Sequence, residues 1–291
     1  MIFDFDATDD LIHGQQIGRF YHGYYKNYCF LPLYVFCGSQ LLVSYLRPSS
    51  KDGAHHAWAI LALLIKGLRK AWPDVQIIFR GDSGFCRHKM LEWCDCRGVF
   101  YIVGIPRNQR LEKLLAPTLD KAQQAFDVSQ EKQKEFTDFV YSAKSWKRER
   151  RIIGKAEVTP QGTNPRFIVT NLEGEKQHLY DHMYCARGNM ENRIKEVQLD
   201  LFSGRTSCHQ WWPNQLRLLF SSLAYLLLER LRVLTLQGTE LMAAQAQTIR
   251  LKILKIGGVI TKNTRRIRLM LSSHYPFSGL FTQALLKLIP T

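Results

Sequence analysis

No uninterrupted apolar run of about 18 residues, the length that a membrane-spanning helix requires, occurs in this 291-residue sequence. The most apolar stretch, residues 216–228, is interrupted by Arg217 and Ser221. A signal peptide is also missing, because four aspartates lie among the first ten residues. The seven cysteines are spaced irregularly, which indicates a reducing cytosol rather than a disulfide framework. We therefore expect a cytoplasmic globular protein with no membrane partner.

Acidic residues are fewer than basic ones, with 25 Asp and Glu against 40 Lys and Arg, and the formal net charge is +15. Such an excess favours a polyanionic partner, although it does not predict a fold. Residues 144–155 carry six basic residues, Arg148 and Arg150 among them, and include Trp146. Two interpretations of this segment remain open. Its cations are solvated side chains of an edge strand, or they contact a DNA backbone while the indole stacks on a base.

A second basic segment lies near the C-terminus. Residues 250–268 hold seven basic residues and no acid, with Arg265 and Arg266 adjacent to each other. A segment of this composition suits contact with phosphates. We expect residues 237–291 to form a basic helical C-terminal region, in which Arg265 and Arg266 are candidate DNA-binding residues.

The first eight residues alternate in a way that predicts a β-strand, with Asp4 and Asp6 on the same side. Placing two carboxylates on a strand otherwise built from Ile and Phe is costly unless a cation neutralises them. Residues 29–36 and 41–46 are predicted as two further strands joined by a turn at Gly38. The sheet is thus expected to begin with three antiparallel strands.

Another acidic position follows a short predicted strand. Residues 54–71 are predicted as a helix, and residues 75–79 form a mostly apolar run, as expected of an interior parallel strand. Asp82 comes shortly after this run, within Arg-Gly-Asp-Ser-Gly-Phe. Open α/β sheets bind ligands at the carboxyl ends of such strands, although Gly-Asp-Ser-Gly is also an ordinary turn sequence. A helix over 88–97 and a strand over 99–105 complete the series.

The order of these elements is that of an α/β fold of the ribonuclease H-like type, a mixed sheet flanked by helices. In this fold, a further helix is expected to carry a third carboxylate. Residues 106–178 come before that helix and are interpreted as a mostly β insertion. The predicted catalytic core therefore has two parts, residues 1–105 and 179–236, and the second part includes an apolar helix over 215–234 that we assign to core packing.

The third carboxylate is predicted on a helix that includes residues 184–196. At about 100° per residue, one face of this helix carries Tyr184, Arg187, Glu191 and Lys195. A separate apolar stripe can seat the helix on a core; it consists of Met190, Ile194, Val197 and Leu201. The charged face alone is equally consistent with i,i+4 ion pairs on a solvated surface, so the functional interpretation depends on the two earlier acidic positions.

Three carboxylates that converge in such a sheet would make a two-metal site. Phosphodiester cleavage needs an activated water or hydroxyl and a stabilised leaving oxygen, and two divalent ions about 3.5–4 Å apart provide both. Hard oxygen ligands select Mg²⁺ or Mn²⁺. Without metal the acids repel one another, so we expect the cluster to be unstable or partly protonated.

Taken together, three segments resemble the DDE transposases of bacterial insertion sequences, in the cut-and-paste branch with a β insertion. The segments are residues 4–8 (Asp-Phe-Asp-Ala-Thr), residues 80–85 (Arg-Gly-Asp-Ser-Gly-Phe) and the pattern Tyr184-x2-Arg187-x3-Glu191. The resemblance covers nearly the whole chain. It implies that Asp6, Asp82 and Glu191 are catalytic and bind metal, with Asp4 as the alternative to Asp6.

The same resemblance implies DNA contacts and an activity. Tyr184, Arg187 and Lys195 would contact phosphates near the scissile bond, and Gln198 replaces the Lys that usually follows the pattern. The implied reaction is Mg²⁺-dependent cleavage of double-stranded DNA at the element's ends, followed by attack of the freed 3′-hydroxyl on target DNA. A homodimer would hold the two ends. A hairpin intermediate is also implied, with Trp146 as a candidate for stacking on a displaced base.

One departure from the family concerns the N-terminus. Members usually carry an N-terminal DNA-binding domain, whereas the first predicted catalytic strand begins here at Met1. We therefore expect a truncated chain. Two alternatives remain open: a ribonuclease H-like nuclease without strand transfer, and an inactive DNA-binding remnant.

Overall fold

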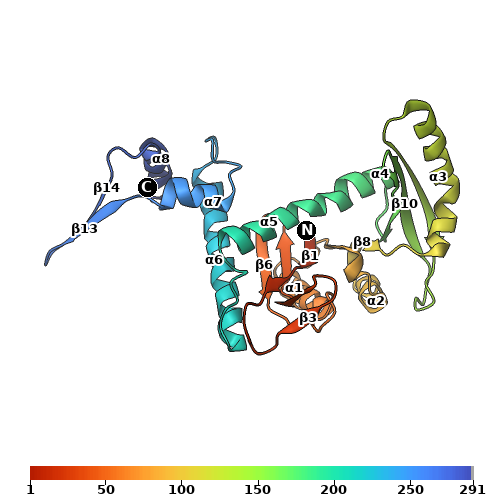
Figure 1. The fold of residues 1–291 in the computed structure, drawn as a ribbon, viewed down its shortest axis with the longest axis horizontal. Coiled ribbons are helices and arrows are strands. Elements are labelled where there is room, and N and C mark those ends of the chain that lie inside the picture. The colour runs from red at the N-terminus through yellow and green to blue at the C-terminus, as the bar shows by residue number, and fades with distance from the viewer. Residues whose placement is uncertain (290–291) are drawn as a thin grey trace.

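The computed structural model describes residues 1–289, and a mixed sheet of nine strands forms its centre (Figure 1). The five core strands, in spatial order, are β6 (Gln40–Tyr45), β5 (Leu33–Cys37), β1 (Ile2–Ala7), β7 (Ile78–Gly81) and β8 (Phe100–Ile105). β6, β5 and β1 are antiparallel, whereas β1, β7 and β8 are parallel. This order and these directions confirm the predicted ribonuclease H-like fold.

Helices cover both faces of the sheet because its strands alternate buried side chains between the two faces. In β5, Leu33 and Val35 belong to the apolar cluster on one face, and Tyr34 and Phe36 to the cluster on the other. The first face packs against three helices: α1 (Ala57–Ala71), α2 (His88–Cys96) and α3 (Gln109–Ser129).

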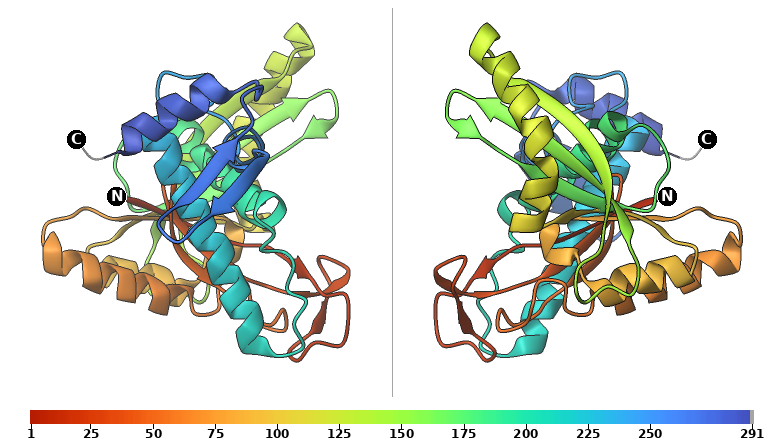
Figure 2. Two further views of the ribbon diagram at one scale, coloured as in Figure 1. Left: turned by 90° about the vertical axis from the view of Figure 1, so that its left-hand side faces the viewer. Right: turned by 90° about the vertical axis from the view of Figure 1, so that its right-hand side faces the viewer.

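The second face packs against two helical segments. One is a continuous helical stretch over 176–200, made of α4 (Lys176–His178), a π-helical turn (Leu179–Tyr184), a 3₁₀ turn (Cys185–Arg187), α5 (Gly188–Lys195) and a second π-helical turn (Glu196–Asp200). The other is α6 (Trp211–Thr235). Figure 2 shows α1 in orange and α6 in cyan on different sides of the sheet.

The segment predicted as a mostly β insertion contains the long helix α3 and four strands, and these strands continue the core sheet. Its strands are β9 (Gln133–Tyr141), β10 (Arg150–Thr159), β11 (Gly162–Thr163) and β12 (Arg166–Thr170). β12 pairs antiparallel with β8, with Phe167 opposite Ile105, and α3 packs against the strands of the insertion. The insertion therefore lies directly beside the carboxyl end of β8.

The prediction of a single strand over 29–36 is wrong, because this segment contains parts of two strands. β4 (Asn27–Phe30) belongs to a separate small sheet with β2 (Asp10–Leu11) and β3 (Phe20–His22), and the core strand β5 begins only at Leu33. Pro32 lies between the two, and a residue without an N–H cannot donate to a ladder.

The C-terminal region, expected to be helical, also contains a β-hairpin. The helices are α7 (Ala246–Ile249), which continues as a π-helical turn (Arg250–Leu254), and α8 (Ser278–Leu288). The hairpin strands are β13 (Gly258–Lys262) and β14 (Ile267–Leu271), which are exposed along their whole length. The hairpin projects away from the rest of the chain (Figure 1).

Only one side of α6 fulfils the expectation of core packing. Leu218 and Tyr225 are buried against the sheet, whereas a stripe of apolar side chains on the helix remains exposed: Trp212, Leu216, Leu219, Phe220, Leu223 and Leu227. Because the helix is apolar on most sides, its sequence did not indicate which side would be covered. Among residues 1–289, no helix combines the length and apolar character needed to span a bilayer.

Candidate active site

The register of two parallel strands brings Asp6 and Asp82 to the same edge of the sheet. In β1 and β7, Phe5 lies opposite Gly81, and the two aspartates are the next residues of their chains. Both line a cavity of about 460 Å³, which we call the acidic cleft. The backbone N–H of Gly84 donates to Oδ1 of Asp82 over 2.8 Å, which orients that carboxylate at the start of a 3₁₀ turn.

The helical stretch over 176–200 brings the third acidic residue to the acidic cleft. Its buried apolar stripe, as predicted, includes Met190, Ile194 and Val197, which pack on the second face of the sheet. With that side fixed, Arg187 and Glu191 line the cleft together with the two aspartates. The structure thus brings together the three carboxylates that the sequence singled out.

Arg187 lies between two of these carboxylates. Its Nη1 donates to Oδ2 of Asp6 over 3.0 Å, and its Nη2 donates to Oε1 of Glu191 over 2.6 Å. The side chains of Arg187 and Asp6 are largely buried, whereas Glu191 is about half exposed. One guanidinium therefore offsets part of the negative charge of the cleft.

The environment of Asp6 opposes its ionised form. The pKa of Asp6 is raised to about 6, mainly by burial; Arg187 lowers it, and the neighbouring charges of Asp82 and Glu191 contribute to the rise. The pKa of Asp6 thus depends on Asp82 and Glu191, because nearby like charges oppose the ionisation of an acid.

Asp4, the alternative to Asp6, has a different partner. The same strand register places Asp4 opposite Arg80 of β7. Nη2 of Arg80 donates to Oδ2 of Asp4 over 2.8 Å, its Nε donates to Oδ1, and its Nη1 donates to the carbonyl of Met183. Both side chains are buried, and Asp4 does not line the acidic cleft. Arg80 is thus the cation that a buried Asp4 requires.

The other residues predicted on the same helix face are divided between two cavities. Lys195 is exposed and lines the acidic cleft, whereas Tyr184 lines an adjoining cavity. Gln198, at the position of the usual Lys, also lines the cleft, and its Nε2 donates to the carbonyl of Asp9 over 3.0 Å and to Oδ1 of Asp10 over 2.8 Å.

Two cleft residues, Tyr24 and Tyr25, were not anticipated from the sequence. The hydroxyl of Tyr25 donates to the carbonyl of Ala7 over 3.4 Å, and the ring of Tyr24 packs edge-on against Tyr25 with 5.0 Å between centroids. The available signal was the aromatic density of residues 20–28, which hold five Phe and Tyr residues. Tyr24 is exposed, and an exposed aromatic ring beside a charged cleft is suited to contacts with bases.

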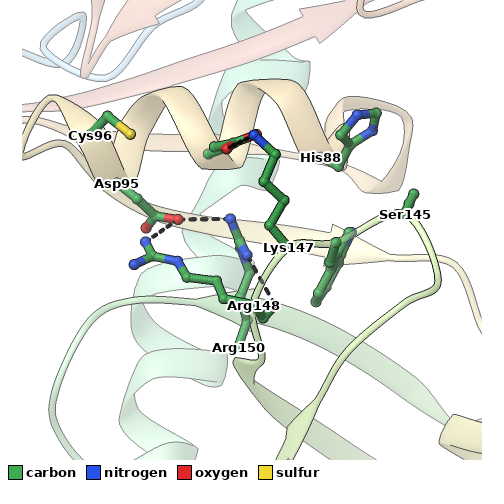
Figure 3. A pocket seen from close by; sticks show the side chains of 9 residues that line it. His88, Asp95, Cys96, Ser145, Lys147, Arg148 and Arg150 are labelled. Carbon is green, nitrogen blue, oxygen red and sulfur yellow. Dashed lines mark hydrogen bonds and ion pairs between the residues drawn. The ribbon is translucent and has the colours of Figure 1, made fainter.

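The basic segment at residues 144–155 lies elsewhere, against α2 (Figure 3). Asp95 of α2 forms ion pairs with Arg148 and, over 2.7 Å, with Nη2 of Arg150. Trp146 is partly buried, with the guanidinium of Arg150 5.2 Å from its ring centroid. The segment therefore ties the insertion to the core. None of the three candidate residues lines the acidic cleft, and their binding of DNA stays a prediction.

Arg265 and Arg266 lie in the turn between β13 and β14. Their backbone N–H groups donate to Oδ1 of Asn263 over 3.0 and 2.9 Å, which shapes the turn, and both residues are exposed. Their contact with DNA also stays a prediction.

No group of three or more His, Cys, Asp and Glu side chains within residues 1–289 is arranged to hold a metal ion. Asp6, Asp82 and Glu191 share the acidic cleft, but the guanidinium of Arg187 lies between Asp6 and Glu191. The two-ion site therefore stays a prediction.

The sequence and the fold were compared with those of known proteins. The sequence matches the family described as Transposase DDE domain group 1 over residues 1–291. No curated protein matches it. Seven chains of solved structures match, among them a piggyBac transposase in a synaptic complex with hairpin DNA. The identity to that chain is 8%, with a TM-score of 0.48, over 77% of this chain and 45% of that one. Because the family match covers its full length, this chain belongs to the DDE transposase-domain family.

Proposed function

We propose that this chain carries the catalytic centre of a transposase that cleaves double-stranded DNA at the ends of a mobile element and joins them to target DNA. The observation that carries the proposal is the presence of Asp6, Asp82 and Glu191 at one cavity, although they come from three distant parts of the sequence. An acid with a raised pKa in a cleft, as Asp6 is, is typical of functional sites. The net charge of +15 suits a DNA substrate.

The donor chemistry of the cleft fits Mg²⁺ or Mn²⁺, because Asp6, Asp82 and Glu191 all offer hard carboxylate oxygens. A divalent cation would also favour the ionised form of Asp6, whose pKa is raised to about 6. When bound, two such ions would activate the attacking water or hydroxyl and stabilise the leaving oxygen.

The side chains around the acids would hold and orient the DNA. Lys195 presents its ammonium group at the exposed side of the cleft, where it can pair with a phosphate. Arg187 holds the carboxylates of Asp6 and Glu191 in place through charge-assisted hydrogen bonds. Tyr24 offers an exposed ring for contact with a sugar or a base.

Incubation of the protein with a duplex that carries the element's end, in the presence of Mg²⁺, tests this function. We expect a 3′-nicked strand and then a joined product, both lost in Asp82→Asn and Glu191→Gln. Asp74→Asn, which changes an exposed aspartate outside the cleft, is the matched control and should keep both activities. Unchanged cleavage in the two cleft variants would contradict the proposal. Cleavage without joining would favour a nuclease, and binding without cleavage a DNA-binding remnant.

We also propose that two copies of the chain act together, because joining two DNA ends to one target requires both ends to be held at once. The exposed apolar stripe of α6 is suited to such a contact, since contiguous exposed apolar side chains mark interaction sites on proteins. Sedimentation of the DNA complex should show two chains, and Leu216→Glu with Leu223→Glu should reduce this to one. Leu63→Glu changes an exposed apolar residue of α1 and should leave the assembly intact.

A further inference from the structure

A second cavity of about 590 Å³ adjoins the acidic cleft, between the end of β8 and the insertion. We call it the basic groove. Its cationic lining residues are Arg107, Lys155 and Arg166, and no Asp or Glu within residues 1–289 lines it. The ammonium of Lys155 is paired with Glu157 over 3.1 Å. Neither arginine forms an ion pair within residues 1–289, and Nε of Arg166 donates to Oδ1 of Asn164 over 3.0 Å. Two exposed guanidinium groups are therefore available to an anionic ligand.

The basic groove and the acidic cleft are joined through shared chain segments. Ser83, which lines the groove, directly follows Asp82, which lines the cleft. On the helical stretch, Tyr184 lines the groove and Arg187, one turn later, lines the cleft. A polymer that places a phosphodiester at the carboxylates can therefore continue into the groove.

The lining of the groove favours recognition of the sugar-phosphate backbone over that of bases. Of its three aromatic residues, Phe167 and Tyr180 are only 3% and 4% exposed and offer no open face for stacking, and only Tyr184 is partly exposed. Guanidinium groups, in contrast, match phosphate oxygens with paired N–H donors. The volume lies within the range of about 300–1,000 Å³ that is usual for ligand-binding pockets, which leaves room for a nucleotide unit.

From this geometry, we propose that the basic groove binds the backbone phosphates of the DNA strand on one side of the scissile bond, through Arg107 and Arg166. The choice of DNA as the polymer rests on the proposed function. Contacts of this kind are independent of base sequence, because phosphates carry no sequence information directly. They would position the strand so that the scissile phosphate lies at the carboxylates.

The test is DNA binding at several salt concentrations, measured by fluorescence anisotropy on a random-sequence duplex with EDTA present. We expect Arg107→Gln with Arg166→Gln to weaken binding roughly tenfold or more. The salt slope should fall by about 0.9 for each phosphate that the double variant no longer neutralises. Lys66→Gln with Lys70→Gln removes the same charge from exposed positions on α1 and should change both quantities much less. Equal effects of the two double variants would overturn the proposal.

A second measurement uses the unmodified protein, in case the arginine variant is impaired in folding. Cys185 is an exposed thiol that lines the basic groove. Bound duplex should slow its alkylation severalfold, and an unchanged rate at saturating DNA would count against the groove as a binding site. Neither assay involves cleavage, so both still test the basic groove if the protein does not cleave DNA. Conversely, intact cleavage with no effect of the arginine variant would reject only the groove.

Discussion

Arg187 donates a hydrogen bond to Asp6 across 181 positions of sequence, with 3.0 Å between Nη1 and Oδ2. The same guanidinium donates to Glu191 over 2.6 Å, so a single cation holds two carboxylates of the acidic cleft. In the proposed enzyme, divalent ions would offset the same negative charge. Arg187 and the metal ions would therefore both reduce the repulsion between the carboxylates.

Removing this guanidinium should make the stability of the protein depend more on metal. In Arg187→Gln, the carboxylates of Asp6, Asp82 and Glu191 repel one another without compensation, and we expect a loss of about 1–2 kcal/mol in the free energy of unfolding. Mn²⁺ should raise the melting temperature of this variant more than that of the unchanged protein. Arg193→Gln serves as the control, because Arg193 lies on the same helix but contacts Tyr225 and Glu229 outside the cleft. An equal Mn²⁺ effect in all three proteins would show that the cleft acids do not share a cation site.

Substitutions of the two neighbouring aspartates of β1 should have different effects. Asp4→Asn leaves the buried Arg80 without its counter-charge and should cost about 3–5 kcal/mol in stability. Asp6→Asn should cost less stability than Asp4→Asn, because Arg187 keeps Glu191 as a counter-charge, yet should abolish cleavage. Urea unfolding and the cleavage assay measure the two quantities. A stable Asp4→Asn without cleavage, beside an active Asp6→Asn, would reverse the assignment.

Gly104 permits the close approach of three segments at the border of the acidic cleft and the basic groove. A Cβ at this position would lie 2.6 Å from the hydroxyl of Tyr184 and 2.9 Å from the backbone nitrogen of Ser83. Gly104→Ala should therefore displace the turn that carries Asp82, cost about 1–3 kcal/mol in stability and slow cleavage. Gly67→Ala, where a Cβ meets no atom within 4 Å, should instead stabilise α1 by about 0.5–1 kcal/mol. If Gly104→Ala cleaves DNA at the rate of the unchanged protein, the close packing of these segments is not required for cleavage.

Asp10 should make the protein less stable as the pH rises. It is buried, and burial raises its pKa from 3.8 to about 7, although Gln198 donates a hydrogen bond to Oδ1. Because the folded state holds this proton more tightly than the unfolded state, the contribution is fully present below about pH 4 and is lost as the pH rises through 7. The loss is at most about 4 kcal/mol. The stability of Asp10→Asn relative to the unchanged protein, measured by urea unfolding, should therefore increase between pH 4 and 8. A pH-independent difference would show that Asp10 ionises normally.

Local patterns in the sequence determined much of the fold. The alternation of the first strand, the apolar stripe of the helix near Glu191 and the strand before Asp82 all depend on neighbours a few positions away, so they are readable without the fold. The boundaries were less accurate, because the strand predicted over 75–79 is observed at Ile78–Gly81. The sequence pattern also predicted that Asp6, Asp82 and Glu191 would meet, and the chain brings them to one cavity.

Only the tertiary structure decided how the charged residues are partnered. The register of β1 against β7 gives Arg80 to Asp4 and leaves Asp6 at the cleft, and no local pattern contains a parallel register. For the same reason, the basic residues Arg148 and Arg150 could not be recognised as partners of Asp95, which lies some 50 positions earlier. The basic groove likewise combines residues of β8, β10, β12 and the helical stretch. Charge is a property of the sequence, whereas the neutralisation of each charge depends on distances that only the folded chain sets.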